Sequence, residues 1–139
     1  ISLHLLTEFW ANYKYLLMAH NVEAYKQCGR LLAQGKQQEL HSLANEFITI
    51  LMTGLSESAT RKKRSNVLQH IQGYLKNHIS SDDKQELNRL ITQYREGIVP
   101  LVVPIILLQH HFKTANMPYI NQQVFMQPYP ENITVRNQL

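Results

Sequence analysis

The chain has 139 residues, the usual size of one domain, of which 44% are hydrophobic and 17% are charged. This composition supplies an apolar core and excludes disorder over most of the length. A single cysteine, Cys28, excludes an intrachain disulfide and a thiolate zinc cage. The longest apolar run, residues 98–108, contains two prolines and is far shorter than the ~20 residues of a membrane span. The N-terminus also lacks a signal-peptide pattern, so we expect a soluble cytoplasmic protein without a membrane partner.

Positive charge gathers in one segment of the chain. The formal net charge is +4 and the sequence pI is near 9.3. No acidic residue occurs between Ser58 and Ser81, and five cations fall there: Arg61, Lys62, Lys63, Arg64 and Lys76. We therefore expect a basic side on the protein, which is compatible with a nucleic-acid partner.

Apolar residues recur at helical spacing as far as residue 115, and no long stretch alternates as a strand would. The first helix is predicted to end near His20 and to bury one apolar stripe: Leu5, Leu6, Phe9, Tyr13, Leu16 and Leu17. The second runs from the N-cap Asn21 to a closing glycine, Gly35. The third covers about residues 37–53 and closes at Gly54.

Three further helices are predicted in the second half. Thr60 caps a fourth helix that continues to Ile79, and Ser80 or Ser81 caps a fifth that ends at Gly97. A sixth starts near residue 100, with a proline at 104 that marks a kink or a delayed start. The predicted class is therefore all-α: a single-domain bundle of about six helices in residues 1–115, followed by an extended Pro- and aromatic-rich strap in residues 116–139.

The basic run at residues 61–64 falls in the first turn of the predicted fourth helix. Cations are disfavoured there by the helix dipole, at about 0.3–1 kcal/mol each, so they call for another role. Free N–H groups and four cations together favour a phosphate or anion site. The alternative is a solvated basic loop that keeps the protein soluble.

A polar face follows on the same helix. Asn66, His70, Gly73 and Asn77 are spaced to line up on one side, with Tyr74 beside them. A glycine inside a helix costs about 1 kcal/mol relative to alanine, which indicates a close approach there. Either another helix or a ribose–phosphate backbone would approach at this position.

Aromatic and basic residues are interleaved in the first two helices. Such a pattern suits base stacking, although most aromatics at helical spacing belong to a core. We expect Tyr15 and Tyr25 to be the exceptions, with their polar tips near Lys14 and Arg30.

Residues with catalytic chemistry form no recognisable pattern. His110 and His111 are adjacent and point about 100° apart on a helix, so they make no ready chelate, and we expect no metal or cofactor. Cys28 is expected to be an inert packed thiol. Asp82 and Asp83 are better explained as first-turn acids under a serine cap than as an acid–base pair.

An ordered set of motifs carries a resemblance that spans nearly the whole chain. The segments are residues 13–20 (YKYLLMAH), 29–31 (GRL), 66–70 (NVLQH), 73–74 (GY), 94–101 (YREGIVPL) and 107–110 (LLQH). Together they resemble the YbgA-like domain of unknown function. The resemblance implies that similar domains occur alone or fused behind a desulfidase domain that removes sulfur from thiolated uracil in tRNA. In such fusions the iron–sulfur chemistry belongs to the partner domain, and the helical domain is expected to present the RNA.

Several polar positions belong to the motifs of this resemblance. They are Lys14, His20, Arg30, Asn66, His70, Arg95 and His110. Two interpretations fit most of them: a shared RNA-facing groove, or a buried hydrogen-bonded network between the first, fourth and sixth helices.

We therefore predict a non-catalytic domain that binds structured RNA such as tRNA. The expected contacts are Arg61, Lys62, Lys63, Arg64, Asn66, His70, Tyr74, Lys76, Lys14 and Arg30. One alternative is a module that docks a separate enzyme through the apolar segment 98–108. A second alternative is a small enzyme whose histidines His20, His70 and His110 converge on a pocket.

Overall fold

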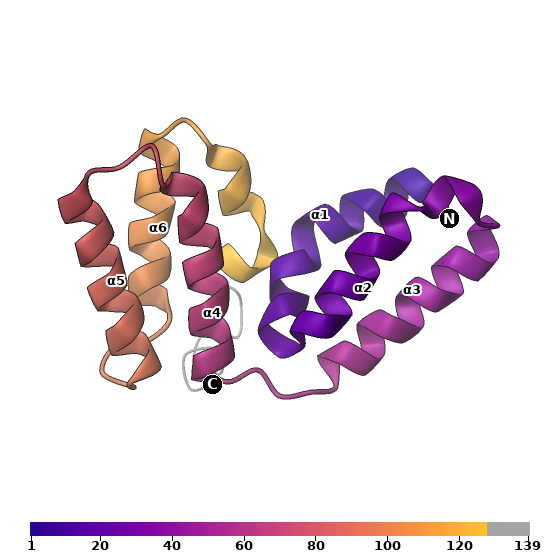
Figure 1. Cartoon of the computed structure of the whole chain (residues 1–139), viewed down its shortest axis with the longest axis horizontal. Helices are drawn as coiled ribbons and strands as arrows, with labels where there is room; N and C mark the ends of the chain where they lie inside the picture. The colour runs from indigo at the N-terminus through magenta and orange to yellow at the C-terminus, as the bar shows by residue number, and fades with distance from the viewer. Residues whose placement is uncertain (128–139) are drawn as a thin grey trace. The chain divides into compact units, whose positions relative to one another are not determined.

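The computed structural model describes residues 1–127, and this part of the chain is helical without strands, which confirms the all-α class (Figure 1). Its α-helices are α1 (Leu3–His20), α2 (Val22–Ala33), α3 (Leu40–Leu55), α4 (Arg61–Gln72), α5 (Ser81–Arg95) and α6 (Val102–Thr114). The 3-10 turns are η1 (Gly35–Gln37), η2 (Gly73–Leu75), η3 (Pro118–Gln122) and η4 (Val124–Met126). None of these helices combines the length and apolar composition that a bilayer span requires.

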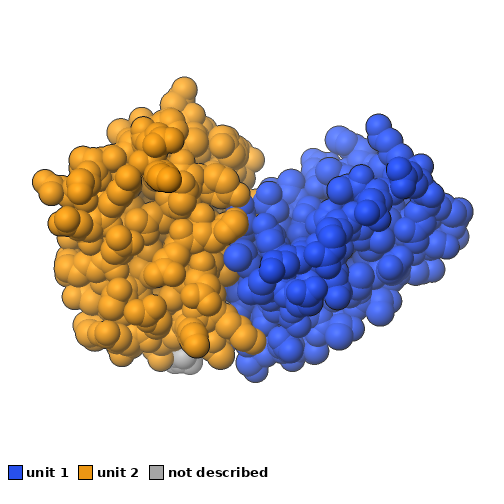
Figure 2. Space-filling model, in the orientation of Figure 1, with its two compact units in different colours: residues 1–59 blue, residues 60–139 orange. Residues whose placement is uncertain are grey.

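The chain divides into two compact units, which Figure 2 shows in different colours. Residues 1–59 form the N-terminal unit and residues 60–139 the C-terminal unit. The organisation of the chain as one domain stays a prediction.

In the N-terminal unit, α2 packs against both α1 and α3 around one apolar core. This core contains Leu6, Leu17, Ala24, Cys28, Leu43, Ala44, Phe47 and Leu51. Gly54 permits the closest approach, because a Cβ there would lie 2.6 Å from the Cβ of Ala24 and 2.9 Å from Cδ1 of Leu17. The glycine is thus required by packing at the end of α3, where the sequence indicated a helix terminus.

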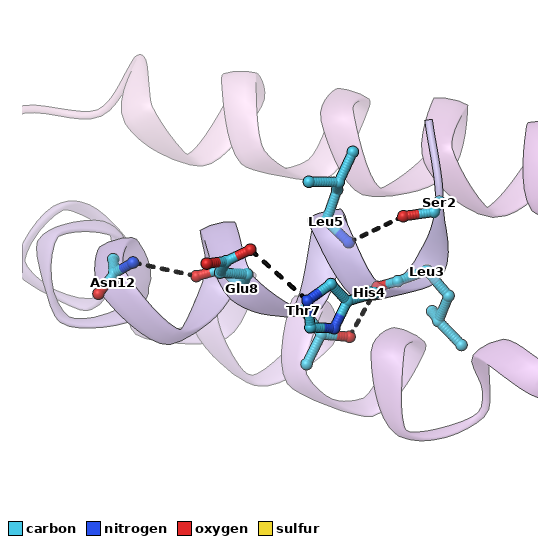
Figure 3. A network of polar contacts seen from close by, with 7 residues as sticks. All are labelled: Ser2, Leu3, His4, Leu5, Thr7, Glu8 and Asn12. Carbon is cyan, nitrogen blue, oxygen red and sulfur yellow. Dashed lines mark hydrogen bonds and ion pairs between the residues drawn. The ribbon is translucent and has the colours of Figure 1, made fainter.

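Local capping explains where these helices begin. The Ser2 hydroxyl accepts a hydrogen bond from the Leu5 N–H at 3.1 Å, and Figure 3 shows this first turn of α1. The Asn21 side chain accepts from the Ala24 N–H at 2.9 Å, as predicted. The predicted start of the third helix at residue 37 is wrong: the helix begins at Leu40, because the Glu39 carboxylate caps it.

The predicted apolar stripe of α1 is only partly correct. Leu6 and Leu17 are buried, but Leu5 is 56% exposed and Phe9 is 37% exposed. Tyr15 instead is buried, on a side of the helix that the stripe did not include. A helix covered on more than one side does not show a single clean stripe in its sequence.

The C-terminal unit is built from α4, α5 and α6, with α5 packed against both of the others. Its fully buried apolar residues include Val67, Leu68, Ile71, Leu75, Leu87, Ile91, Leu108 and Phe112. Thr60 and Ser80 cap α4 and α5 as predicted, with bonds of 3.1 Å from the Lys63 and Asp83 N–H groups. Gly97 has a φ of +79°, which explains why α5 ends before a glycine.

Two boundaries in this unit differ from prediction. The fourth helix ends as an α-helix at Gln72 and continues as the 3-10 turn η2, so it does not reach Ile79. The sixth helix begins at Val102, which places Pro104 in its first turn. Because the first-turn N–H groups have no intrahelical partner, this proline marks a delayed start and not a kink.

The described part of the predicted strap, residues 116–127, lies against α6. The Gln109 side chain donates to the Met126 carbonyl, and the Asn121 amide donates to the Gln109 carbonyl at 3.2 Å. The backbone forms the turns η3 and η4 and not a fully extended strand, because Ile120, Phe125 and Met126 turn inward and are buried. The rest of the predicted strap, residues 128–139, lies outside the described residues.

Candidate nucleic-acid interface

The four cations at the start of α4 do not share one environment. Arg61 and Lys62 are exposed, Lys63 is half-buried, and Arg64 is only 6% exposed. Arg64 is therefore not the mobile phosphate contact that the sequence suggested, because it lies on the buried side of α4, which it shares with Val67 and Leu68. No acidic residue lies in the first turn to offset these charges.

Lys62, Asn66 and His70 occupy one side of α4, because residues four apart on a helix are neighbours. All three are exposed. The His70 ring meets the Tyr74 ring edge-on, with centroids 5.8 Å apart and an interplanar angle of 89°. Tyr74 is 42% exposed, so this aromatic pair is accessible.

We call six of the exposed side chains of α4 and of the turn after it the α4 surface. Its members are Arg61, Lys62, Asn66, His70, Tyr74 and Lys76. Neither Arg61 nor Lys62 has an ion-pair partner within residues 1–127. The Arg61 guanidinium lies beside the backbone of Gly97, with its Cζ 3.7 Å from where a Cβ of Gly97 would stand.

The predicted polar face is wrong at its C-terminal end. Gly73 belongs to η2, and nothing lies within 4 Å of the position of a Cβ there. No other helix therefore makes the predicted close approach at this glycine within the described residues, and the alternative, a ribose–phosphate backbone, stays a prediction. Asn77 lies beyond both helical segments, because the α-helical register ends at Gln72.

A pocket of about 350 Å³ opens between the end of α4 and α5. It is lined by Gln69, Gln72, Gly73, Lys76, Lys84 and Asn88. Of these residues, Gly73 and Lys76 are among those predicted from the sequence, and the other four are not. Lys84 and Asn88 are four residues apart on α5, but their spacing alone does not indicate that they face α4.

Charge is distributed unequally along the chain. Residues 1–59 contain four lysines and arginines against five acidic residues, whereas residues 60–127 contain nine against four. One acid of the C-terminal unit is already neutralised, since Glu86 binds Arg89 with N–O distances of 2.7 and 3.2 Å. This contact lowers the pKa of Glu86 and raises that of Arg89. The positive charge of the protein therefore belongs to the C-terminal unit.

The predicted contacts in the N-terminal unit have other local partners. Lys14 lies over the Tyr15 ring, with its Nζ 5.2 Å from the centroid. Arg30 is exposed and approaches Glu23 at 3.4 Å. Tyr15 is 1% exposed, so its predicted exposure is wrong, and its ring packs 6.3 Å from that of half-buried Tyr25. The aromatic residues here serve mainly as core.

The buried polar network predicted from the family motifs is wrong for its members in the C-terminal unit, because Asn66, His70 and Arg95 are all exposed. In the N-terminal unit, Nδ1 of His20 lies 2.7 Å from the carbonyl oxygen of Glu57. The alternative, one groove shared by all the motif positions, involves both units and stays a prediction.

The structure gives limited support to the alternative function of a module that docks a separate enzyme. In the segment 98–108, Ile98 and Ile106 are exposed, whereas Leu101, Ile105 and Leu108 are buried and the three valines and Leu107 are half-buried. The segment is therefore not the exposed apolar face that a docking module was predicted to present.

The side chains considered for catalysis or metal binding are the histidines, Cys28 and the two acids of α5. The His110 and His111 rings lie 5.5 Å apart at 62°, and His110 is exposed. Within residues 1–127, no group of three or more His, Cys, Asp or Glu residues is placed to hold a metal ion. Cys28 is fully buried, as predicted for a packed thiol, and desolvation raises its pKa to about 11. Asp82 and Asp83 lie in the first turn of α5, as predicted.

Comparison with known proteins identifies relatives but no activity. A family model described as "Protein of unknown function (DUF1722)" matches residues 14–130. The chain is also 30% identical over 133 residues to the "Uncharacterized protein YbgA" of Escherichia coli (strain K12), covering 95% of this chain and 79% of that protein. No solved structure matches it.

Proposed function

This chain belongs to the family of proteins of unknown function DUF1722, and we propose that it binds structured RNA, tRNA among others, through the α4 surface of its C-terminal unit. The single observation that carries the proposal is the accessible set of cations, amide and aromatic rings along one helix. Lysine and arginine neutralise phosphates, whereas Tyr74 and His70 offer rings against which an unpaired base stacks.

The energetics of the helix start support a ligand of negative charge. Arg61 and Lys62 each oppose the dipole of α4 at a cost of about 0.3–1 kcal/mol. A phosphate bound at this end reverses the sign of that interaction, because free N–H groups and cations then face an anion. The local instability of the unbound helix start is thus compensated in the complex.

The choice of tRNA rests on the resemblance described above, in which similar domains are fused to enzymes that act on thiolated tRNA. The chain itself holds one cysteine, so it supplies no thiolate set for an iron–sulfur cluster. In this proposal it holds the RNA, and chemistry on the RNA belongs to a separate protein.

The test is a binding titration of fluorescently labelled tRNA at several salt concentrations, with single-stranded RNA and a DNA duplex as comparisons. If about five phosphates are neutralised, affinity falls roughly 500-fold between 50 and 200 mM salt. The variant Arg61→Ala/Lys62→Ala removes two exposed cations and is expected to reduce the magnitude of the logarithmic salt slope by about two.

A control of equal charge is available in the N-terminal unit. Lys26→Ala/Lys36→Ala also removes two exposed lysines and is expected to leave the salt slope near that of the parent protein. Equal effects of the two double variants would contradict a site on α4, and absence of tRNA binding at low salt would refute the proposal as a whole.

A further inference from the structure

The pocket between α4 and α5 is lined by lysine and carboxamide side chains and by Gly73. Two lysines, Lys76 and Lys84, and three carboxamides, Gln69, Gln72 and Asn88, surround it, and none of its lining residues is acidic. Two lysines therefore line a pocket that has no carboxylate in its lining to balance their charge. Such a lining selects an anion that also carries hydrogen-bonding groups.

One polar atom in this lining lacks a partner. The side-chain Oε1 of Gln72 is buried and forms no hydrogen bond within the described residues. A buried acceptor without a donor costs about 1–3 kcal/mol, so a donor brought by a ligand or a water would stabilise this atom. The missing partner is an N–H or O–H donor.

The size and chemistry of the pocket point to one nucleotide. A volume of about 350 Å³ lies at the lower end of small-ligand sites, which suits a single base with its sugar and phosphate. Glutamine and asparagine bind base edges through paired donor and acceptor groups, and lysine binds phosphate as a point charge. Structured RNA exposes such units at bulges, loops and ends.

We propose that the pocket between α4 and α5 receives one unpaired nucleotide of a bound RNA, with its phosphate on Lys76 and Lys84 and a base N–H on the Gln72 carboxamide. This inference rests on the proposed function and deepens it. The cations of the α4 surface bind the RNA backbone, and the pocket adds a preference for RNA that has an unpaired base to the stacking by Tyr74 and His70.

Gly73 allows the pocket to be filled without disturbing the fold. Its backbone is helical, with φ −55° and ψ −29°, and no heavy atom lies within 4 Å of its missing Cβ. A leucine at this position is therefore sterically permitted and projects beside the pocket that Gly73 lines. The matched variant Gly73→Ala adds one methyl group and leaves most of the volume open.

The experiment compares two RNA hairpins that differ by a single bulged adenosine. For the parent protein we expect at least tenfold tighter binding of the bulged hairpin than of the fully paired one. Gly73→Leu is expected to reduce this preference to less than twofold while leaving the affinity for the paired hairpin unchanged. Gly73→Ala is expected to retain most of the preference, and circular dichroism checks that both variants are folded.

The outcomes separate this inference from the proposed function. Binding of both hairpins with equal affinity would overturn the nucleotide pocket and leave RNA binding by α4 intact, whereas binding of neither would overturn both. A preference that survives Gly73→Leu would overturn the pocket as its origin. Titration with free adenosine 5′-monophosphate tests whether the pocket binds a free nucleotide instead of a nucleotide within RNA. Saturable binding of the free nucleotide, without any preference for the bulged hairpin, would overturn the assignment to RNA.

Discussion

Replacement of glycine by alanine is expected to have opposite effects on stability at two positions, Gly54 near the end of α3 and Gly73 directly after α4. At Gly54, the Cβ introduced by alanine would lie 2.6 Å from the Cβ of Ala24. That atom is fixed to the backbone of α2 and has no rotamer by which to move away, so α2 and α3 must separate. At Gly73 nothing lies within 4 Å, and the backbone is already helical.

The magnitudes follow from these surroundings. Overpacking a core costs about 1–3 kcal/mol, and the better helix propensity of alanine returns part of this, about 1 kcal/mol or less near a helix end. We therefore expect Gly54→Ala to destabilise its unit by about 1–2 kcal/mol. Gly73→Ala is expected to stabilise by about 0.5–1 kcal/mol, because it restricts the unfolded chain and meets no clash.

Thermal and urea unfolding measure both changes in stability, and two spectroscopic signals show which unit of the protein is affected. The single tryptophan, Trp10, packs 5.7 Å from Tyr25 and 6.0 Å from Phe47, so its fluorescence reports on the N-terminal unit. Far-UV circular dichroism reports on all helices. The variant Gly54→Ala should lower the fluorescence midpoint, and Gly73→Ala should raise the midpoint measured by circular dichroism.

A double variant tests the cause of the loss. Ala24→Gly/Gly54→Ala removes the atom that the new methyl group would meet, so it should be more stable than the sum of the two single effects. The reasoning would be refuted if Gly54→Ala were as stable as the parent protein, or if the two changes at residues 24 and 54 were additive.

Two further predictions concern a buried thiol and a helix cap. Folding raises the pKa of Cys28 from 9.0 to about 11. The folded state is therefore favoured by this thiol below pH 9, and that contribution to the free energy of unfolding is lost as the pH rises toward 11. Thermal midpoints measured across this range should fall less steeply for Cys28→Ala than for the parent protein. Thr60→Ala removes the hydrogen bond from the Lys63 N–H and should lower the free energy of unfolding in urea by about 1 kcal/mol. Thr60→Ser keeps the hydroxyl group and should retain most of that stability. Equal losses in the two variants would contradict the capping role.

Much of the helical layout follows from local sequence. Asn21, Thr60 and Ser80 cap helices where the sequence predicts, because a cap bond joins residues three apart and requires no distant partner. Gly97 ends α5 with a positive φ for the same reason. Predictions of this kind depend only on neighbours along the chain.

The candidate site was predictable in part. The basic run and the spacing of Asn66 and His70 predict an accessible polar side of α4, and these two residues and Lys62 are exposed in the structure. Burial of Arg64 was missed, because a run of four cations does not show which residue faces the core. The pocket was missed as well, because it requires Gln72 on one helix and Lys84 on another to face each other.

The sequence by itself thus determined the all-α class, the main helix caps and the segment that carries the positive charge. Tertiary structure decided which member of the basic run is buried, where α4 stops being α-helical, and which side chains of α4 and α5 enclose a pocket. The physical reason is the range of the interactions. Capping and helix propensity act within a few residues, whereas burial and cavities arise where segments distant in the chain pack together.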